Sequence, residues 1–193
     1  KDIDSFWIID PLDGTTNYIH GFPYYAISIA YLEKGKILHA VIIDVSSQDE
    51  FTASLGKGSY LNNRRIRVSK REGIKGALLS NSSHNTESSK IIHDNMATFR
   101  ELYLHGLTIR RTGSAALDLA NVAAGRLDGF WGSGLEVWDF AAGGLLVQEA
   151  GGLVSNYLGE TDYLKDGNII CATTKCFKPM LKAIKPFVSI KEF

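Results

Sequence analysis

The stretch FWIIDPLDGTTNYIHG, residues 6–21, carries the features that decide both the fold and the chemistry of this chain. Its apolar run from Phe6 to Ile9 predicts a strand that delivers Asp10 at its carboxyl end. Pro11 is expected to force a turn there, so that Asp13 returns close to Asp10. Two carboxylates held this close repel each other unless a cation lies between them. Oxygen ligands of this kind suit a hard ion such as Mg²⁺.

The residues that follow Asp13 predict a binding place for an anion. Gly14 lets the backbone approach a ligand closely, and Thr15 and Thr16 add two hydroxyl groups. A helical turn is expected through residues 17–19, and backbone N–H groups at a helix start can bind phosphate oxygens. Metal and phosphate in one loop would suit metal-assisted phosphoryl hydrolysis. Taken alone, the segment is equally consistent with a plain turn at Asp13–Gly14 and a capping role for Asp10.

Two later segments are also ambiguous when each is taken alone. The segment EVWDFAAGGLLVQEAGG, residues 136–152, places Asp139 near the start of a helical run, where an aspartate is commonly an N-cap. The segment RRTGSAALDLANVAAG, residues 110–125, opens a helix at Gly113–Ser114 and offers small side chains, Ala115 among them, for close packing.

Together, DPLDGTTN, RRTGSAALDLA and LDGFWGSGLEVWDFAAG resemble, in this order, the motifs of the inositol monophosphatase family of lithium-sensitive, magnesium-dependent phosphatases. The resemblance runs from Trp7 to about Gly152. The segment GKGSYLNNRRIRVS, residues 56–69, is similar to a glycine-rich segment of the same family. Three motifs in matching order and spacing are a much more specific signal than any single one.

The resemblance implies direct, in-line attack on phosphorus by metal-activated water, without a phospho-enzyme. It implies two or three Mg²⁺ ions per site, with Mn²⁺ as a substitute and Li⁺ as an inhibitor, and a homodimer. The metal ligands would be Asp10, Asp13, Asp139 and the backbone carbonyl of Leu12, and the catalytic residues Asp13 and Thr15. The substrate would contact the metal ligands Leu12, Asp13 and Asp139, the backbone N–H groups of Gly14 and Thr15, and the turn Gly113, Ser114 and Ala115.

The chain departs from the family pattern at three places. The family carries a further metal-binding glutamate upstream of the D-P-x-D motif, and we expect residues upstream of Lys1 to supply it. Gly132 stands where many members have a glutamate that accepts hydrogen bonds from substrate hydroxyls, which puts inositol specificity in doubt. Glu136 should repel a second phosphate group, although Arg110 and Arg111 lie near another motif and could offset this repulsion.

Composition excludes several other classes of protein. The 21 basic and 21 acidic side chains cancel, so the charge footprint of a nucleic-acid-binding protein is missing. The sequence has no apolar run long enough to span a membrane and no signal peptide, so we expect a cytoplasmic protein without a membrane partner. Two cysteines, Cys171 and Cys176, are too few for a disulfide framework and are expected to be reduced thiols.

The pattern of elements predicts an α/β fold whose first half is α+β, arranged as a layered αβαβα sandwich. Strand-like segments 24–33 and 37–45 flank a Lys34–Gly35–Lys36 turn, and segments 50–55 and 66–68 form a second hairpin, which gives an antiparallel sheet. After residue 75 strands alternate with helices, which predicts a mixed α/β sheet. We expect a metal-binding subdomain over residues 1–73, incomplete at its start, and an α/β subdomain over residues 74–193 that completes the active site.

Three functions are consistent with these residues. The first is a metal-dependent phosphatase that acts on a small monoester such as an inositol phosphate or a sugar phosphate. The second keeps the chemistry but changes the substrate to fructose-1,6-bisphosphate, a nucleotide 3′-phosphate or NADP. The third is a degenerate, non-catalytic partner protein, which Gly132 and the missing upstream glutamate would favour.

Overall fold

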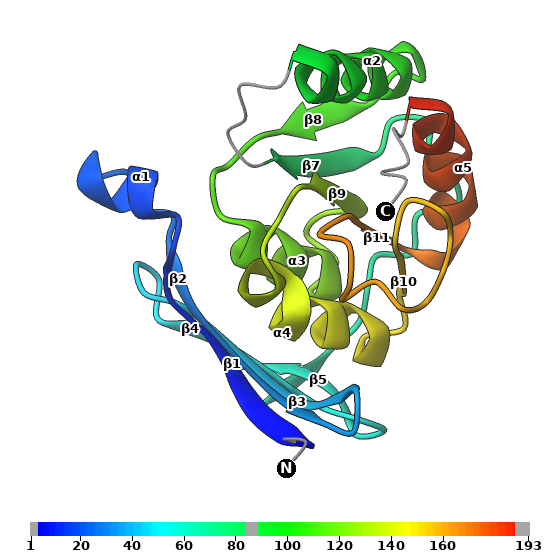
Figure 1. Ribbon diagram of the computed structural model, residues 1–193. Helices are drawn as coiled ribbons and strands as arrows, with labels where there is room; N and C mark the ends of the chain where they lie inside the picture. The colour runs from blue at the N-terminus through cyan, green and yellow to red at the C-terminus, as the bar shows by residue number, and fades with distance from the viewer. Residues whose placement is uncertain (1–3, 84–88, 188–193) are drawn as a thin grey trace.

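The computed structural model describes residues 4–83 and 89–187, which form two sheets with helices between them and on one outer side (Figure 1). The first sheet is antiparallel, and its strands follow one another in chain order. They are β1 (Ser5–Asp13), β2 (Ala26–Glu33), β3 (Lys36–Asp44), β4 (Asp49–Ser54), β5 (Gly58–Leu61) and β6 (Arg64–Ile66). The predicted antiparallel first half is therefore confirmed.

Strand β1 continues through Pro11, where the sequence predicts a turn. The strand pairing shifts between Asp10 and Asp13, which marks a bulge. Among the described residues β1 lies at the edge of its sheet, so the missing N–H of Pro11 costs no ladder hydrogen bond to another described strand on that side. Side chains three residues apart on a regular strand point to opposite faces, so the bulge is what brings both aspartates to one side. The turn expected at Pro11 was wrong, but the predicted approach of the two carboxylates is found.

The segment GKGSYLNNR contains an additional strand, β5, where the sequence predicts only a turn between two strands. Two tight turns enclose this strand. Asn62 and Asn63 both have positive φ, at 48° and 63°, the left-handed conformation that a two-residue hairpin turn requires. Lys34 and Gly35 likewise form a two-residue turn at the predicted place.

The second sheet is mixed, as predicted, and has the strand order β10-β11-β9-β7-β8. Its strands are β7 (Leu78–Ser83), β8 (Thr108–Arg110), β9 (Gly129–Ser133), β10 (Leu153–Ser155) and β11 (Ile169–Ala172). The helices of the chain are α1 (Thr15–Ile19), α2 (Ser89–Leu104), α3 (Ala115–Ala123), α4 (Val137–Glu149) and α5 (Thr174–Ile184), followed by the 3₁₀ turn Lys185–Phe187. Strand β10 has no counterpart in the sequence prediction, and α5 begins four residues before the helix predicted from Lys178.

Helices α3 and α4 lie between the two sheets, and α2 and α5 cover the far face of the mixed sheet (Figure 1). The larger apolar core fills the space around α3 and α4, and a second core lies beneath α2 and α5. The architecture is an α/β sandwich, and the described residues supply four of the five predicted layers. The helical layer predicted over the outer face of the antiparallel sheet is not formed by them, and the subdomain division after residue 73 stays a prediction.

Two smaller expectations concern the membrane and the cysteines. Within residues 4–83 and 89–187, every helix is too short or too polar to cross a bilayer. Cys171 and Cys176 are buried free thiols.

Candidate metal and phosphate site

Three carboxylates converge where β1 meets the start of α4. Asp10, Asp13 and Asp139 each place an oxygen so that all three oxygens lie within 4.8 Å of one another. Two of these residues come from the bulge of β1 and the third from the first turn of α4, and β1 and α4 pack against each other. The structure thus brings together the three acidic residues that the sequence predicts as metal ligands.

Asp139 is held at the beginning of α4 by its own backbone surroundings. One oxygen, Oδ2, accepts a hydrogen bond of 2.9 Å from the backbone N–H of Glu136. The apolar residues that follow in α4, from Phe140 to Val147, are buried, so the helix cannot turn without exposing them. The packing of α4 therefore fixes the direction in which the half-buried Asp139 carboxylate points.

Asp13 is buried and receives two hydrogen bonds from the start of α3. Its Oδ2 atom accepts from the Ser114 hydroxyl at 2.5 Å and from the backbone N–H of Ala116 at 2.8 Å. Burial raises the pKa of Asp13 to about 6, and the charges of Asp10 and Asp139 act in the same direction, although both hydrogen bonds oppose the rise. The raised pKa is thus mainly the result of burial, and the two neighbouring carboxylates add to it.

The loop between the two aspartates and α1 is ordered by short-range contacts. Asp10 accepts a hydrogen bond from the Leu12 N–H at 3.0 Å, while burial raises the Asp10 pKa above its ordinary value. The Leu12 carbonyl accepts a hydrogen bond of 2.9 Å from the exposed Thr15 hydroxyl. Gly14 has a φ of 85°, and a side chain there would lie 2.9 Å from the Tyr24 carbonyl oxygen. The predicted metal and phosphate residues of this loop therefore form one compact group.

The turn predicted to contact the substrate alcohol lies beside this loop. Ser114 and Ala115 are buried, and the Ser114 hydroxyl is already engaged by Asp13 and the Leu117 N–H. Gly113 is the exposed member of the three. A substrate that approaches this turn would therefore meet the backbone of Gly113 first, and the substrate contacts of the turn stay a prediction.

Two of the three departures from the family pattern, Gly132 and Glu136, lie within the described residues. Gly132 is buried in β9, and a Cβ atom there would lie only 2.4 Å from the Leu135 side chain. Leu135 thus fills the space that a larger residue at position 132 would need. Glu136 is exposed and directly precedes α4, three residues before Asp139.

Three polar residues behind the site were missed by the sequence prediction. Asn17 donates hydrogen bonds to two backbone carbonyls, and the Tyr24 hydroxyl donates to the fully buried Asp118 carboxylate at 3.1 Å. Burial raises the pKa of Asp118 to about 7, despite hydrogen bonds from Thr112 and Tyr24. The available signal was Asp118 itself, since it is the only charged residue in the helix sequence AALDLANVA, in which Asn121 is the other polar residue.

The donor set fits a divalent cation. Three carboxylates confined within 4.8 Å repel one another unless protons or a cation neutralise them, and all the donors are oxygen atoms. Mg²⁺ and Mn²⁺ accept such a set together with water and phosphate oxygens, whereas ions that favour sulfur or imidazole do not. The geometry therefore supports a site for a hard divalent ion beside a loop that could hold phosphate.

Comparison with known proteins agrees with the motifs and the geometry. The family model described as the inositol monophosphatase family matches residues 1–188. The Nus factor SuhB of Pseudomonas aeruginosa is 53% identical over 184 residues, which cover 95% of this chain and 68% of that protein.

Solved structures extend this similarity to the fold. The extragenic suppressor protein suhB of Bartonella henselae has a TM-score of 0.90 and 40% identity, with coverage of 97% of this chain and 71% of that one. An inositol monophosphatase from Anabaena has a TM-score of 0.87 and 35% identity, with coverage of 98% and 78%. Sequence, fold and the acidic cluster therefore agree that this chain belongs to the inositol monophosphatase family.

Proposed function

We propose that this protein hydrolyses a small phosphate monoester, of the sugar-phosphate or polyol-phosphate class, with divalent cations at Asp10, Asp13 and Asp139. The observation that carries the proposal is the convergence of the three carboxylates within 4.8 Å, next to the loop that contains Gly14 and Thr15. The substrate class is proposed by analogy with the inositol monophosphatase from Anabaena, whose fold this chain shares.

Mg²⁺ is the proposed ion, with Mn²⁺ as a substitute and Li⁺ as an inhibitor. Asp10, Asp13, Asp139 and the carbonyl oxygen of Leu12 would hold it, and an upstream glutamate in the full-length protein would add a further ligand. When bound, the ion would supply Lewis-acid polarisation of the phosphoryl group and activation of water.

The protein groups have separate proposed tasks around that ion. The backbone N–H groups of Gly14 and Thr15 would bind phosphate oxygens. Because the Thr15 hydroxyl donates its hydrogen bond to the Leu12 carbonyl, its oxygen lone pairs would accept a hydrogen bond from a water molecule and so orient that water. Asp13, fixed by two hydrogen bonds from the start of α3, would hold its carboxylate still during the attack.

The alcohol side of the site differs from that of an inositol-specific enzyme. Gly132 offers no acceptor for substrate hydroxyls, and the apolar Leu135 side chain fills the adjacent space. The exposed carboxylate of Glu136 would disfavour a second phosphate group near the start of α4. These features favour a broad-specificity monophosphatase over a bisphosphatase, with Gly113, Ser114 and Ala115 as the wall toward the alcohol.

Replacing Asp139 by asparagine is expected to lower kcat/KM for monoester hydrolysis by at least about a hundredfold, because the site loses one of its three charged ligands. The measurement is release of inorganic phosphate by the full-length protein with Mg²⁺, from inositol-1-phosphate, sugar phosphates, fructose-1,6-bisphosphate, a nucleotide 3′-phosphate and NADP. Asp162→Asn is the control, because Asp162 is an exposed carboxylate paired with Lys165.

Hydrolysis that survives Asp139→Asn would overturn the metal assignment. A kcat/KM at least about tenfold higher for the bisphosphate, nucleotide or NADP would move the substrate to that class. Such a ratio corresponds to roughly 1.4 kcal/mol of preference in the transition state.

A second candidate function comes from the name of the relatives. Several proteins that are 40–53% identical to this chain are named Nus factor SuhB, a name that points to transcription. In that role the chain would act as a binding partner, and binding would persist in the Asp139→Asn protein while hydrolysis was lost. A wild-type protein that is inactive on the whole substrate panel would favour this candidate.

Assembly and location are proposed on family grounds. The protein would act as a cytoplasmic homodimer. Size-exclusion chromatography with light scattering on the full-length protein measures the oligomeric state directly.

A further inference from the structure

The side-chain amide of Asn17 connects two segments that flank the carboxylate cluster. Its Nδ2 atom donates to the carbonyl oxygen of Tyr24 and to the carbonyl oxygen of Thr112, each at 2.8 Å. Asn17 follows the loop of Asp13 and Thr15, and Thr112 directly precedes the turn that begins at Gly113. The amide group therefore joins the loop to the turn at Thr112 and, at the same time, to the segment of Tyr24 that leads into β2.

The backbone of the turn packs directly on this amide. Gly113 has a φ of 90°, and a Cβ atom there would lie 2.9 Å from Nδ2 of Asn17. On the other side, Gly14 packs on the backbone of Tyr24 and Tyr25, at would-be Cβ distances of 2.9 and 3.2 Å. The loop, the amide and the turn are consequently in close contact, with little free space for one to move without the others.

The buried carboxylate of Asp118 also connects the segments of Thr112 and Tyr24. Asp118 Oδ1 accepts hydrogen bonds from the Thr112 hydroxyl at 2.7 Å and from the Tyr24 hydroxyl at 3.1 Å. These donors belong to the same two residues whose carbonyl groups Asn17 binds. Asn17 and Asp118 thus hold Thr112 and Tyr24 together twice, once through backbone and once through side chains.

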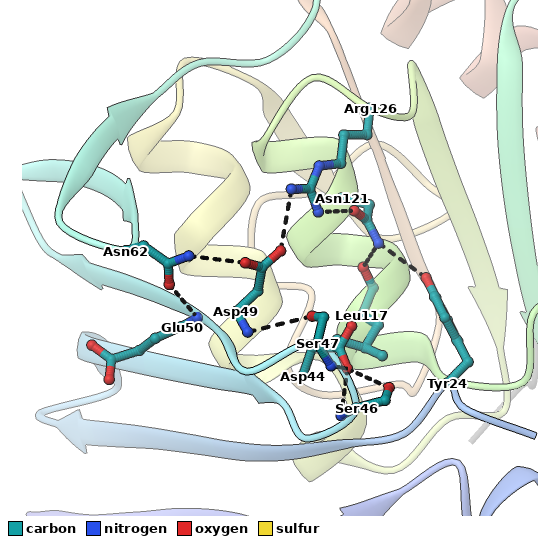
Figure 2. A network of polar contacts seen from close by, with 10 residues as sticks. All are labelled: Tyr24, Asp44, Ser46, Ser47, Asp49, Glu50, Asn62, Leu117, Asn121 and Arg126. Atoms are coloured by element: carbon teal, nitrogen blue, oxygen red, sulfur yellow. Dashed lines mark hydrogen bonds and ion pairs between the residues drawn. The ribbon is translucent and has the colours of Figure 1, made fainter. Parts of the chain in front are cut away.

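The network continues outward from Tyr24 to the surface, as Figure 2 shows. Asn121 donates to the Tyr24 hydroxyl at 3.0 Å, Arg126 donates to the Asn121 side chain at 3.2 Å, and Arg126 pairs with Asp49 at 3.2 Å. This outer part joins α3 to the start of β4. Within the part of the chain that the structure describes, the hydrogen bonds and the ion pair of Asn121 and Arg126 do not reach the loop of Asp13, so this outer part serves as an internal comparison.

The contact between the loop and the turn matters because the turn supplies the hydrogen bonds of Asp13. The Ser114 hydroxyl and the Ala116 N–H, which both donate to Asp13, follow Thr112 by two and four residues. A shift of the turn relative to the loop would redirect the Asp13 carboxylate. Misplacement of a reacting group by about 1 Å can cost about a hundredfold in rate.

We infer that Asn17, Tyr24 and Asp118 are positioning residues, which clamp the Asp10–Thr16 loop to the Thr112–Ala115 turn and so orient Asp13 toward Asp10 and Asp139. This inference rests on the proposed function for its effect on catalysis. The clamp itself is a property of the folded chain and can be measured without any substrate.

The test compares four variants of the full-length protein. Asn17→Ala removes both bridging hydrogen bonds, and Thr112→Val removes the hydroxyl donor to Asp118 while it keeps the side-chain volume. Thr112→Ser restores that donor, and Asp49→Asn breaks only the outer ion pair. Asn17→Ala and Thr112→Val are expected to lower kcat by roughly ten- to a hundredfold with KM changed less than about threefold, while Thr112→Ser and Asp49→Asn stay within about twofold of wild type.

Amide hydrogen exchange provides the readout that does not depend on activity. Exchange in peptides that cover residues 12–18 and 112–117 should accelerate in Asn17→Ala and Thr112→Val, but not in Thr112→Ser or Asp49→Asn. Wild-type kcat and wild-type exchange in Asn17→Ala would overturn the inference. So would a loss of kcat in Thr112→Ser equal to that in Thr112→Val.

The two proposals fail in distinguishable ways. If the wild-type protein hydrolyses none of the esters, the proposed function fails and the exchange pattern alone decides whether the clamp exists. If the wild-type protein is active and Asn17→Ala keeps full kcat, only the clamp fails.

Discussion

Replacing Asp13 by asparagine is expected to lower kcat/KM for phosphate-ester hydrolysis by about a thousandfold or more. The substitution removes the most buried of the three charges and leaves a group that binds a divalent cation weakly. An asparagine carbonyl can still accept hydrogen bonds from Ser114 and Ala116, so the fold should persist. Phosphate release with Mg²⁺ measures the loss, and activity within about tenfold of wild type would contradict it.

The free energy of unfolding of the same variant, measured in EDTA, should show whether the lost activity comes from the missing negative charge of Asp13. The folded-state pKa of Asp13 is about 6, above its ordinary value of 3.8, so between these values the folded protein binds more protons than the unfolded chain. The free energy of unfolding therefore falls as pH rises through this window, by up to about 3 kcal/mol for the full shift. Asp13→Asn has no proton to lose there, so metal-free Asp13→Asn should be more stable than metal-free wild type at pH 8.

Urea unfolding at pH 5 and pH 8 in EDTA checks this expectation. Asp118 is present in both proteins, but the charge of Asp13 contributes to its raised pKa, so the difference between the two proteins reports the Asp13 charge together with its effect on Asp118. Saturating Mg²⁺ should stabilise the wild type at pH 8 and have little effect on the variant. A variant that is less stable than wild type at pH 8 in EDTA would show that the Asp13 charge is already neutralised within the fold.

Replacing Gly14 by alanine is expected to be the most damaging change in the loop that does not touch a charge. Alanine at a φ of 85° is strained by roughly 1–2 kcal/mol. Its Cβ atom would also lie 2.9 Å from the Tyr24 carbonyl and 3.2 Å from the Tyr25 Cα atom, both of which are backbone atoms that cannot rotate away. The loop must therefore move, and we expect kcat/KM to fall by at least about a hundredfold.

Gly35→Ala is the matched control for this prediction. Gly35 has a similar φ of 74°, but nothing lies within 4 Å of its would-be Cβ atom. Gly35→Ala should therefore lower the free energy of unfolding only by the conformational strain, about 1 kcal/mol, and leave kcat/KM unchanged. Equal effects of the two substitutions on activity would show that the close approach of Gly14 to Tyr24 has no catalytic importance.

Much of the fold could be predicted because local signals agree with the final packing. The Lys34–Gly35 turn and the alternation of strands and helices after residue 75 follow from turn chemistry and apolar periodicity. The path of β1 through Pro11 could not be predicted in this way. Whether a proline ends a strand or lies within a strand at a sheet edge depends on the tertiary arrangement, and β1 is at the edge in the strand order of the described residues.

The candidate site likewise contains residues that could be predicted from the sequence and contacts that could not. Asp10, Asp13 and Asp139 could be predicted from their motifs, since they carry the chemistry. The hydrogen bonds of Ser114 to Asp13 and of Asn17 to Thr112 could not, because they join segments about 100 residues apart. Sequence motifs therefore indicate which groups act, whereas the groups that hold them in place become visible only in the folded chain.

The central claim is that Asp10, Asp13 and Asp139 form a divalent-cation site, and calorimetric titration of the metal-free, full-length protein with Mn²⁺ tests it most directly. The account predicts saturable binding to the wild type and to Asp49→Asn, with binding weakened at least about tenfold in Asp139→Asn. Binding that is absent from the wild type, or unchanged in Asp139→Asn, would contradict it.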